Sequence, residues 1–245
     1  MSAGIPTITL VNTASGNNSA TATIIAAETL PANTQVGDLV ICLIYERGGN
    51  ISTTPPKDTS DGWIFLDYGY NATNNFGMVL AAWICTFTNA TDLIGITLPS
   101  TTSHSFCMAS FRLPAGYYFN HSKASGSLGL AGWFNATVST TSLFAPAIAQ
   151  PYAQCLDIIG RGYGADGTGV TTATVTDFIE IFDAGQLAPP QGLVLNHRTV
   201  TSYNVNDLVS SITTAAKIDR GGVRAMIPIV SRTSSNRYMS PRRLF

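Results

Sequence analysis

The chain has 245 residues, of which 45% are hydrophobic and only 11% are charged, and its formal net charge is −1 at pH 7. This length accommodates one large all-β domain or two small ones, and the apolar content is sufficient for a packed core. Because the chain as a whole is nearly neutral, its net charge excludes nucleic-acid binding of the kind that depends on a strongly basic protein. The low charged fraction is typical of a surface that packs against other proteins or hydrogen-bonds sugars.

The first half of the sequence predicts strands separated by turns. Val36–Tyr45 passes from a Gly-Asp turn into a run that is apolar on both faces, as a central strand requires. In 78–89, the face that carries Trp83 is apolar and the other face ends polar, which predicts a central strand that emerges at its C-terminal end. Trp63 is expected to anchor another strand in the core. The predicted strands are Ile5–Val11, Thr21–Ile25, Asp38–Glu46, Trp63–Tyr70, Met78–Asn89, Ile94–Leu98 and Ser105–Leu113.

The second half continues in the same way, with weaker strands that are richer in threonine. Asn206–Ala216 is as plausible a strand as a helix, because its hydroxyl and β-branched residues oppose its candidate N-cap. The glycine-rich Gly160–Gly164 predicts a kink or bulge. The predicted strands are Cys155–Tyr163, Phe178–Phe182, Gly192–Val200 and Val223–Val230. The expected fold is therefore all-β, a jelly-roll-like sandwich of two antiparallel sheets with very little helix.

Residues 1–231 are expected to form a single β-sandwich domain, with a candidate internal boundary near 122–132, where glycine, serine and alanine dominate. Residues 232–245 form a basic C-terminal arm. Arginines crowd this end of the chain, and Arg198, Arg220 and Arg224 precede the arm. The arm is either a solvated tail or a segment that docks on acidic groups of a partner. The candidate docking residues are Arg232, Arg237, Arg242, Arg243, Leu244 and Phe245.

The N-terminus, Met1–Pro6, lacks the charged and apolar regions of a signal peptide, and no stretch reaches the roughly 18 apolar residues of a membrane span. We therefore expect synthesis in a cytoplasm and no membrane span. The four cysteines are widely spaced in apolar, strand-like runs, which favours free, buried thiols over disulfides or metal ligands. They are Cys42, Cys85, Cys107 and Cys155.

No catalytic constellation is recognisable. His104, His121 and His197 lie outside any nucleophile motif, and glutamate is scarce, which disfavours the paired carboxylates of a glycosidase. No phosphate-binding loop or spaced calcium loop is present, so we expect no enzyme activity, no catalytic or metal-binding residues and no cofactor. Exposed aromatics beside abundant asparagine are typical of a sugar-binding surface. The candidate sugar-facing residues are Tyr68, Tyr70, Tyr117 and Tyr118.

The order of Val36–Tyr45, Asp61–Trp63 and Met78–Phe87 resembles a β-sandwich module of bacteriophage virion proteins, found in tail, tail-fibre and head-decoration components. The resemblance extends from Ile5 to Val230 as an order of motifs. It implies a structural or adhesive protein.

From the residues and the resemblance together we expect a non-enzymatic virion structural protein, an outward-facing component attached to the head or tail. It would be made in the host cytoplasm and would form a homo-oligomer in contact with capsid, neck or tail subunits. The alternative is a tail-fibre adhesin that binds host polysaccharide, and a depolymerase ranks below both.

Overall fold

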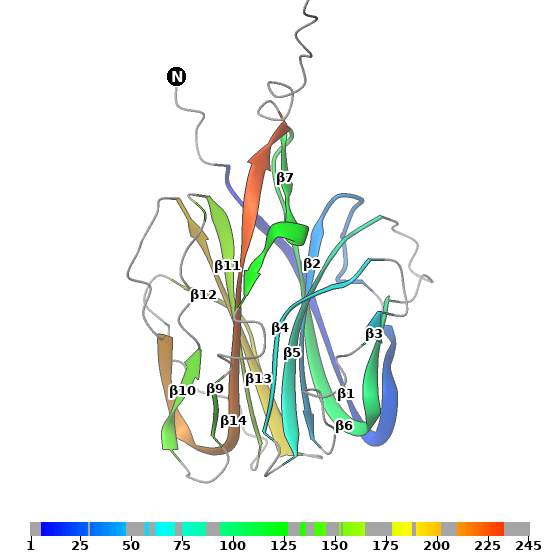
Figure 1. The fold of residues 1–245 in the computed structure, drawn as a ribbon, viewed down its shortest axis with the longest axis vertical. Coiled ribbons are helices and arrows are strands. Elements are labelled where there is room, and N and C mark those ends of the chain that lie inside the picture. The colour runs from blue at the N-terminus through cyan, green and yellow to red at the C-terminus, as the bar shows by residue number, and fades with distance from the viewer. Residues whose placement is uncertain are drawn as a thin grey trace, which may run out of the picture.

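The computed structural model is built of antiparallel strands in two sheets that pack face to face (Figure 1). The predicted all-β class is confirmed, and the described elements are strands and one short 3-10 helix, η1 (His121–Lys123). In the part of the chain that the structure describes, no helix is long and apolar enough to cross a membrane. The structure describes residues 6–28, 30–47, 57–58, 62–71, 75–86, 94–126, 133–135, 140–145, 152, 154–164, 178–187, 190–201 and 210–232.

The N-terminal half of the chain forms the first sheet, in the order β1-β6-β2-β5-β4, with β3 paired to β6. β2 has neighbours on both edges and is apolar on both faces, so its prediction as a central strand is confirmed. β5 also lies inside the sheet, between β2 and β4. The strands are β1 (Thr9–Glu28), β2 (Leu39–Arg47), β3 (Lys57–Asp58), β4 (Ile64–Asn71), β5 (Phe76–Ile84) and β6 (Ile94–Arg112).

β1 and β6 are longer than the sequence indicated, with 20 and 19 residues. Each joins two segments that were expected to be separate strands, because the two strands pair with each other from Thr9–Arg112 to Glu28–Ile94. Register shifts, one of them between Asn18 and Ala22, accommodate the polar stretches. Backbone pairing thus carries the sheet through residues whose composition favours loops.

The C-terminal half forms the second sheet, in the order β10-β14-β11-β13-β12, and the short strands β7, β8 and β9 also pair with β14. The segment that fitted either a helix or a strand is strand from Ser210 onward. The elements are β7 (Tyr117–Phe119), β8 (Ser125–Gly126), β9 (Trp133–Asn135), β10 (Thr140–Ala145), β11 (Cys155–Gly164), β12 (Ile179–Leu187), β13 (Pro190–Val200) and β14 (Ser210–Ser231). The chain passes between the sheets at residues 113–116, ahead of the 122–132 stretch.

One continuous core lies between the sheets and takes side chains from both halves of the chain. β11 contributes two glycines to it. A Cβ on Gly160 would overlap the end of Leu43, and one on Gly162 would overlap the ring of Tyr45, so both glycines let first-sheet side chains reach the second-sheet backbone. The predicted irregularity is also present, since the pairing of β11 with β14 shifts register between Gly162 and Gly164.

The outer faces of the central strands β2, β5 and β11 are buried as well. On the first sheet, Trp63 and Trp83 pack with their ring centroids 6.2 Å apart, and both are buried as expected. All four cysteines are buried and free, and burial raises the pKa of the thiols of Cys42 and Cys107.

The outer face of the second sheet carries buried charges beside small apolar clusters around Ile159 and Met226. Arg220 and Arg224 are 0% exposed, so these two members of the C-terminal arginine group belong to the interior and not to a basic surface. Arg224 donates to Asp157 through Nε at 3.0 Å and Nη2 at 2.7 Å, and Arg198 donates to the same carboxylate at 2.8 Å. Sequence counting could not separate these arginines from those of the arm.

The same strand joins the two sheets along one side. The backbone N–H of Arg224 donates to the buried carboxylate of Asp67, on β4, at 2.9 Å. This N–H lies between the points where β8 and β9 pair with β14, so an aspartate of the first sheet satisfies a donor at a gap in the second sheet's ladder.

Replacing Gly160 by alanine tests the close approach of the sheets. We expect Gly160→Ala to lower the free energy of unfolding by roughly 1–3 kcal/mol, because its methyl group competes with Leu43 for the same volume. Urea denaturation measures the change. Leu43→Ala should cost less in the Gly160→Ala background than in the wild type, and strictly additive losses would contradict the packing interpretation.

Because His197 is buried, we expect the free energy of unfolding to depend on pH. Its ring packs edge-on against Phe111 at 5.2 Å, and burial lowers its pKa from the ordinary value of 6.5. The unfolded chain therefore binds the proton first, so stability falls as the pH drops below about 6.5, with a limiting slope of about 1.4 kcal/mol per pH unit. His197→Gln should flatten this part of a pH series of urea midpoints. Burial also lowers the pKa of His121 in η1, so His121→Gln should flatten the series as well, and an unchanged series for His197→Gln would contradict the role of His197.

Candidate functional site

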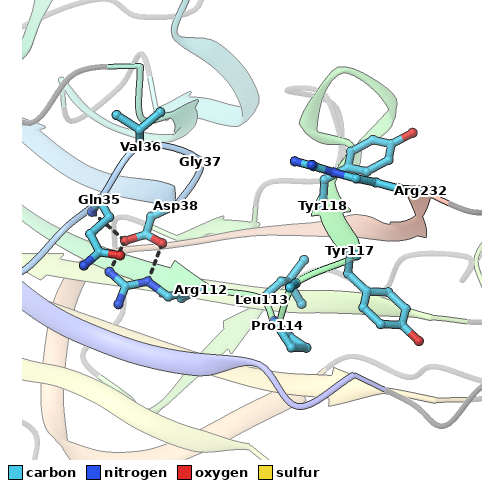
Figure 2. A pocket seen from close by; sticks show the side chains of 12 residues that line it. Gln35, Val36, Gly37, Asp38, Arg112, Leu113, Pro114, Tyr117, Tyr118 and Arg232 are labelled. Carbon is cyan, nitrogen blue, oxygen red and sulfur yellow. Dashed lines mark hydrogen bonds and ion pairs between the residues drawn. The ribbon is translucent and has the colours of Figure 1, made fainter.

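A pocket of about 230 Å³ opens at the end of the sandwich where β7 pairs with the end of β14 (Figure 2). Three segments form it: the turn before β2, the turn between β6 and β7, and the last described residue, Arg232. We call it the apical pocket. Its lining residues are Gln35, Val36, Gly37, Asp38, Arg112, Leu113, Pro114, Ala115, Gly116, Tyr117, Tyr118 and Arg232.

A bidentate ion pair holds one side of the apical pocket. Arg112 donates to the carboxylate of Asp38 through Nε at 2.8 Å and Nη2 at 2.7 Å, and Nη2 also donates to the carbonyl of Asn33 at 2.9 Å. The hydrogen bond to Asp38 raises the pKa of Arg112. Because the Asp38 side chain is only 3% exposed, the pair fixes the end of β6 against the turn before β2.

The turn itself is also fixed. The N–H of Gln35 donates to the Asp38 carboxylate at 2.7 Å, and the N–H of Gly37 donates to the carbonyl of Cys85 at 2.8 Å. Gly37 has φ 93°, a conformation that glycine adopts without steric cost. These contacts leave Val36 66% exposed at the tip of the turn.

β7 and the end of β14 form the other side. Tyr118 lies opposite Val230 in the pairing, and the N–H of Arg232 donates to the carbonyl of Gly116 at 2.8 Å. Tyr118 is 37% exposed, whereas Tyr117 packs partly against the core. Figure 2 shows Asp38 and Arg112 on one side of the pocket and both tyrosines with Arg232 on the other.

A second hollow of about 480 Å³ adjoins the first and shares Arg112, Leu113, Pro114 and Tyr117 with it. Pro6, the first described residue, is part of its lining. The first and last described residues of the chain therefore lie at the same end of the sandwich.

The candidate site residues fall into separate groups. Tyr117, Tyr118 and Arg232 come together at the apical pocket. Tyr68 and Tyr70 lie on β4, where Tyr70 is opposite Gly77, towards the far end of the first sheet. Both are half-buried against the outer layer of that sheet, and the hydroxyl of Tyr70 donates to Asn75. The candidates Arg237, Arg242, Arg243, Leu244 and Phe245 lie outside the described residues.

The sequence did not reveal the roles of Val36 and Arg112. The turn before β2 was recognisable from its Gly-Asp pair, but Arg112 is 74 residues from Asp38 and no local signal connects them. Chemically, the pocket offers two guanidinium groups, exposed aromatic and aliphatic surface, and an amide at Gln35. Its one carboxylate, that of Asp38, is held by Arg112.

No protein-family model, curated protein or solved structure matches this chain.

Removing the Asp38 carboxylate should loosen the turn before β2. We expect Asp38→Ala to lower the free energy of unfolding by roughly 1–3 kcal/mol, because it deprives Arg112 and the N–H of Gln35 of their acceptor. Chemical denaturation measures the loss. Glu180→Gln, at an exposed carboxylate on β12, is the matched control and should leave the midpoint unchanged. Equal midpoints for all three proteins would show that the ion pair is not structural.

Proposed function

We propose that the protein is a non-enzymatic structural component of a bacteriophage virion, a β-sandwich attached to the head or tail that faces outward. The observation that carries the proposal is the asymmetry of the molecule. Pro6 and Arg232 lie at one end, and that end also exposes Val36 and Tyr118. A module that is attached through one end and exposed over the rest of its surface has this arrangement.

The composition supports the same function. Charged residues make up 11% of the chain, and lysine occurs only at Lys57, Lys123 and Lys217. The central strands β2, β5 and β11 are buried on both faces, and a packed unit with few charged residues suits permanent packing against other subunits. We place the protein in the virion after synthesis in the host cytoplasm. Its partners would be capsid, neck or tail subunits and further copies of itself.

The C-terminal arm is the proposed attachment segment. From Arg232 to Phe245 the sequence contains four arginines and no acidic residue, and it ends in Leu244 and Phe245. Guanidinium groups on partner carboxylates and two apolar side chains in a pocket would hold such an arm, and burial of the two side chains contributes about 3–5 kcal/mol before ordering costs.

A second candidate function is recognition of host polysaccharide by a tail-fibre adhesin. The exposed ring of Tyr118 in a polar pocket favours it, because sugars stack on aromatic faces and hydrogen-bond to amides and guanidinium groups. The other candidate tyrosines on β4 are half-buried and add less to such a surface.

Truncation of the arm tests the structural function. Phage particles carrying a gene that lacks residues 233–245 should contain at least tenfold less of this protein than wild-type particles, as measured by quantitative mass spectrometry after density-gradient purification. The purified truncated protein should keep its far-ultraviolet circular dichroism spectrum, because the two-sheet core lies before Arg232. Absence of the wild-type protein from purified particles would refute the function, and unchanged occupancy of the truncated protein would refute the role of the arm.

A further inference from the structure

We propose that a separate pocket, formed between η1 and the end of β14, binds an acidic sugar residue of the hexuronate class. This goes beyond the proposed structural function and does not depend on it. The pocket has a volume of about 370 Å³, which lies within the range of small-molecule sites. We call it the η1 pocket, and its lining residues are Asn120, Lys123, Tyr152, Gln154, Pro228, Ile229 and Val230.

Hydrogen bonds between neighbouring lining residues hold the η1 pocket together. The N–H of Asn120 donates to the carbonyl of Pro228 at 2.9 Å, and the N–H of Ile229 donates to the carbonyl of Gln154 at 3.1 Å. On the η1 side, the N–H of Lys123 donates to the carbonyl of Asn120 at 3.0 Å. The segments that precede η1 and β11 are therefore both fixed to the same stretch of β14, and three distant parts of the chain become neighbours in the lining.

Tyr152 supplies an aromatic ring that is held in place. Its hydroxyl donates to the carbonyl of Lys123, and its side chain packs against a buried cluster of Cys155, Val200 and Met226. The tyrosine is half-buried and lines the pocket beside apolar residues of β14. A partly exposed ring next to apolar surface is suited to stacking against the C–H face of a sugar ring.

The polar groups of the lining match hydroxyls and one carboxylate. Lys123 is exposed and is the single charged residue of the lining, so the pocket favours an anion. The side-chain oxygen of Asn120 accepts from the hydroxyl of Ser122 at 2.9 Å, which orients the amide so that its N–H groups can donate to a ligand. Gln154 brings a second amide. A hexuronate combines a carboxylate, several hydroxyls and an apolar ring face, and it therefore matches all of these groups.

An acidic peptide is a poorer match for the η1 pocket. Extended peptides commonly bind by main-chain hydrogen bonds to an open strand edge. Here the carbonyl of Pro228 and the N–H of Ile229 are bonded within the protein, and Ile229 and Val230 also pair with β7. Recognition in this pocket must therefore rely on side chains, and amides beside an aromatic ring are suited to the hydroxyls and ring face of a sugar.

Titration of the purified, isotope-labelled protein with methyl β-D-glucuronide, followed by NMR, tests the class of ligand. A ligand of this size is expected to bind with a Kd of about 1 mM and to shift the backbone amide signals of Lys123 and Ile229. Methyl β-D-glucoside, which lacks the carboxylate, and N-acetylglutamate, which lacks the sugar ring, should each bind at least fivefold more weakly. Equal affinity for N-acetylglutamate would show a general anion or peptide site and would overturn the inference.

Substitutions in the lining test the role of each group. Lys123→Gln should weaken binding of the glucuronide at least fivefold and leave binding of the glucoside within twofold. Tyr152→Leu keeps an apolar side chain against the buried cluster but removes the ring, so it should weaken binding of both sugars at least fivefold, whereas Tyr152→Phe should weaken it less than threefold. Lys57→Gln, on β3 and outside the lining, is the matched control and should leave both affinities unchanged.

Three results would contradict the η1 pocket as the site. They are absence of glucuronide binding to the wild type, an affinity unchanged by Lys123→Gln, and binding that is lost in Tyr118→Ala of the apical pocket but retained in Tyr152→Leu. The last result would move the sugar site to the apical pocket. None of them bears on the structural function, which is tested separately by truncation of the arm in particles.

Discussion

The rest of this fold depends on the ion pairs that the buried carboxylate of Asp157 makes with two arginines. The carboxylate lies inside the second sheet's outer layer and accepts hydrogen bonds from Arg224 and Arg198. A buried ion pair of this kind adds little stability compared with apolar packing, but loss of one partner leaves an uncompensated charge at a cost of about 3–5 kcal/mol. The ring of Phe178, 4.5 Å from the Arg198 guanidinium carbon, completes the layer. The arginines must therefore stay in place, and the position of β14 is fixed with them.

β14 in turn organises the molecule. Among the described strands, β7, β8, β9, β10 and β11 pair with it, and its Arg224 N–H donates to Asp67 of the first sheet. One side of the sandwich is thereby tied together by a hydrogen bond between sheets, while the core side chains pack above the glycines of β11. The end of β14 then carries Arg232 to the apical pocket, so the strand that fixes the core also positions one side of that pocket.

The faces of the two sheets that point away from the shared core are packed in different ways. The first sheet uses apolar packing around Trp63 and Trp83, and the second combines paired charges around Asp157 with small apolar clusters. The central strands are covered on both faces, and of the three exposed large hydrophobic residues that the structure describes, Val36 and Tyr118 line the apical pocket near Arg232, whereas Ile179 lies on β12. The exposed pair near Pro6 and Arg232 is the reason for proposing attachment at that end.

The sequence by itself determined the class of fold and much of its interior. Alternation and β-branched residues predicted the strands, the two-faced apolar run at Val36–Tyr45 predicted the central position of β2, and the burial of Trp63 and Trp83 followed from the same patterns. These features depend on neighbours within a few residues, where side-chain periodicity is directly visible.

Only the tertiary structure decided which charges are internal and which residues meet. Arg220 and Arg224 are indistinguishable by composition from Arg232, yet two are buried and one is exposed, because β14 runs from the interior to the end of the sandwich. Asp38 and Arg112 pair across 74 residues through the alignment of β2 with β6, and Tyr117 and Tyr118 separate from the tyrosines of β4 because they lie in another sheet. Register and sheet order set these distances, and neither is encoded within a local stretch of the chain.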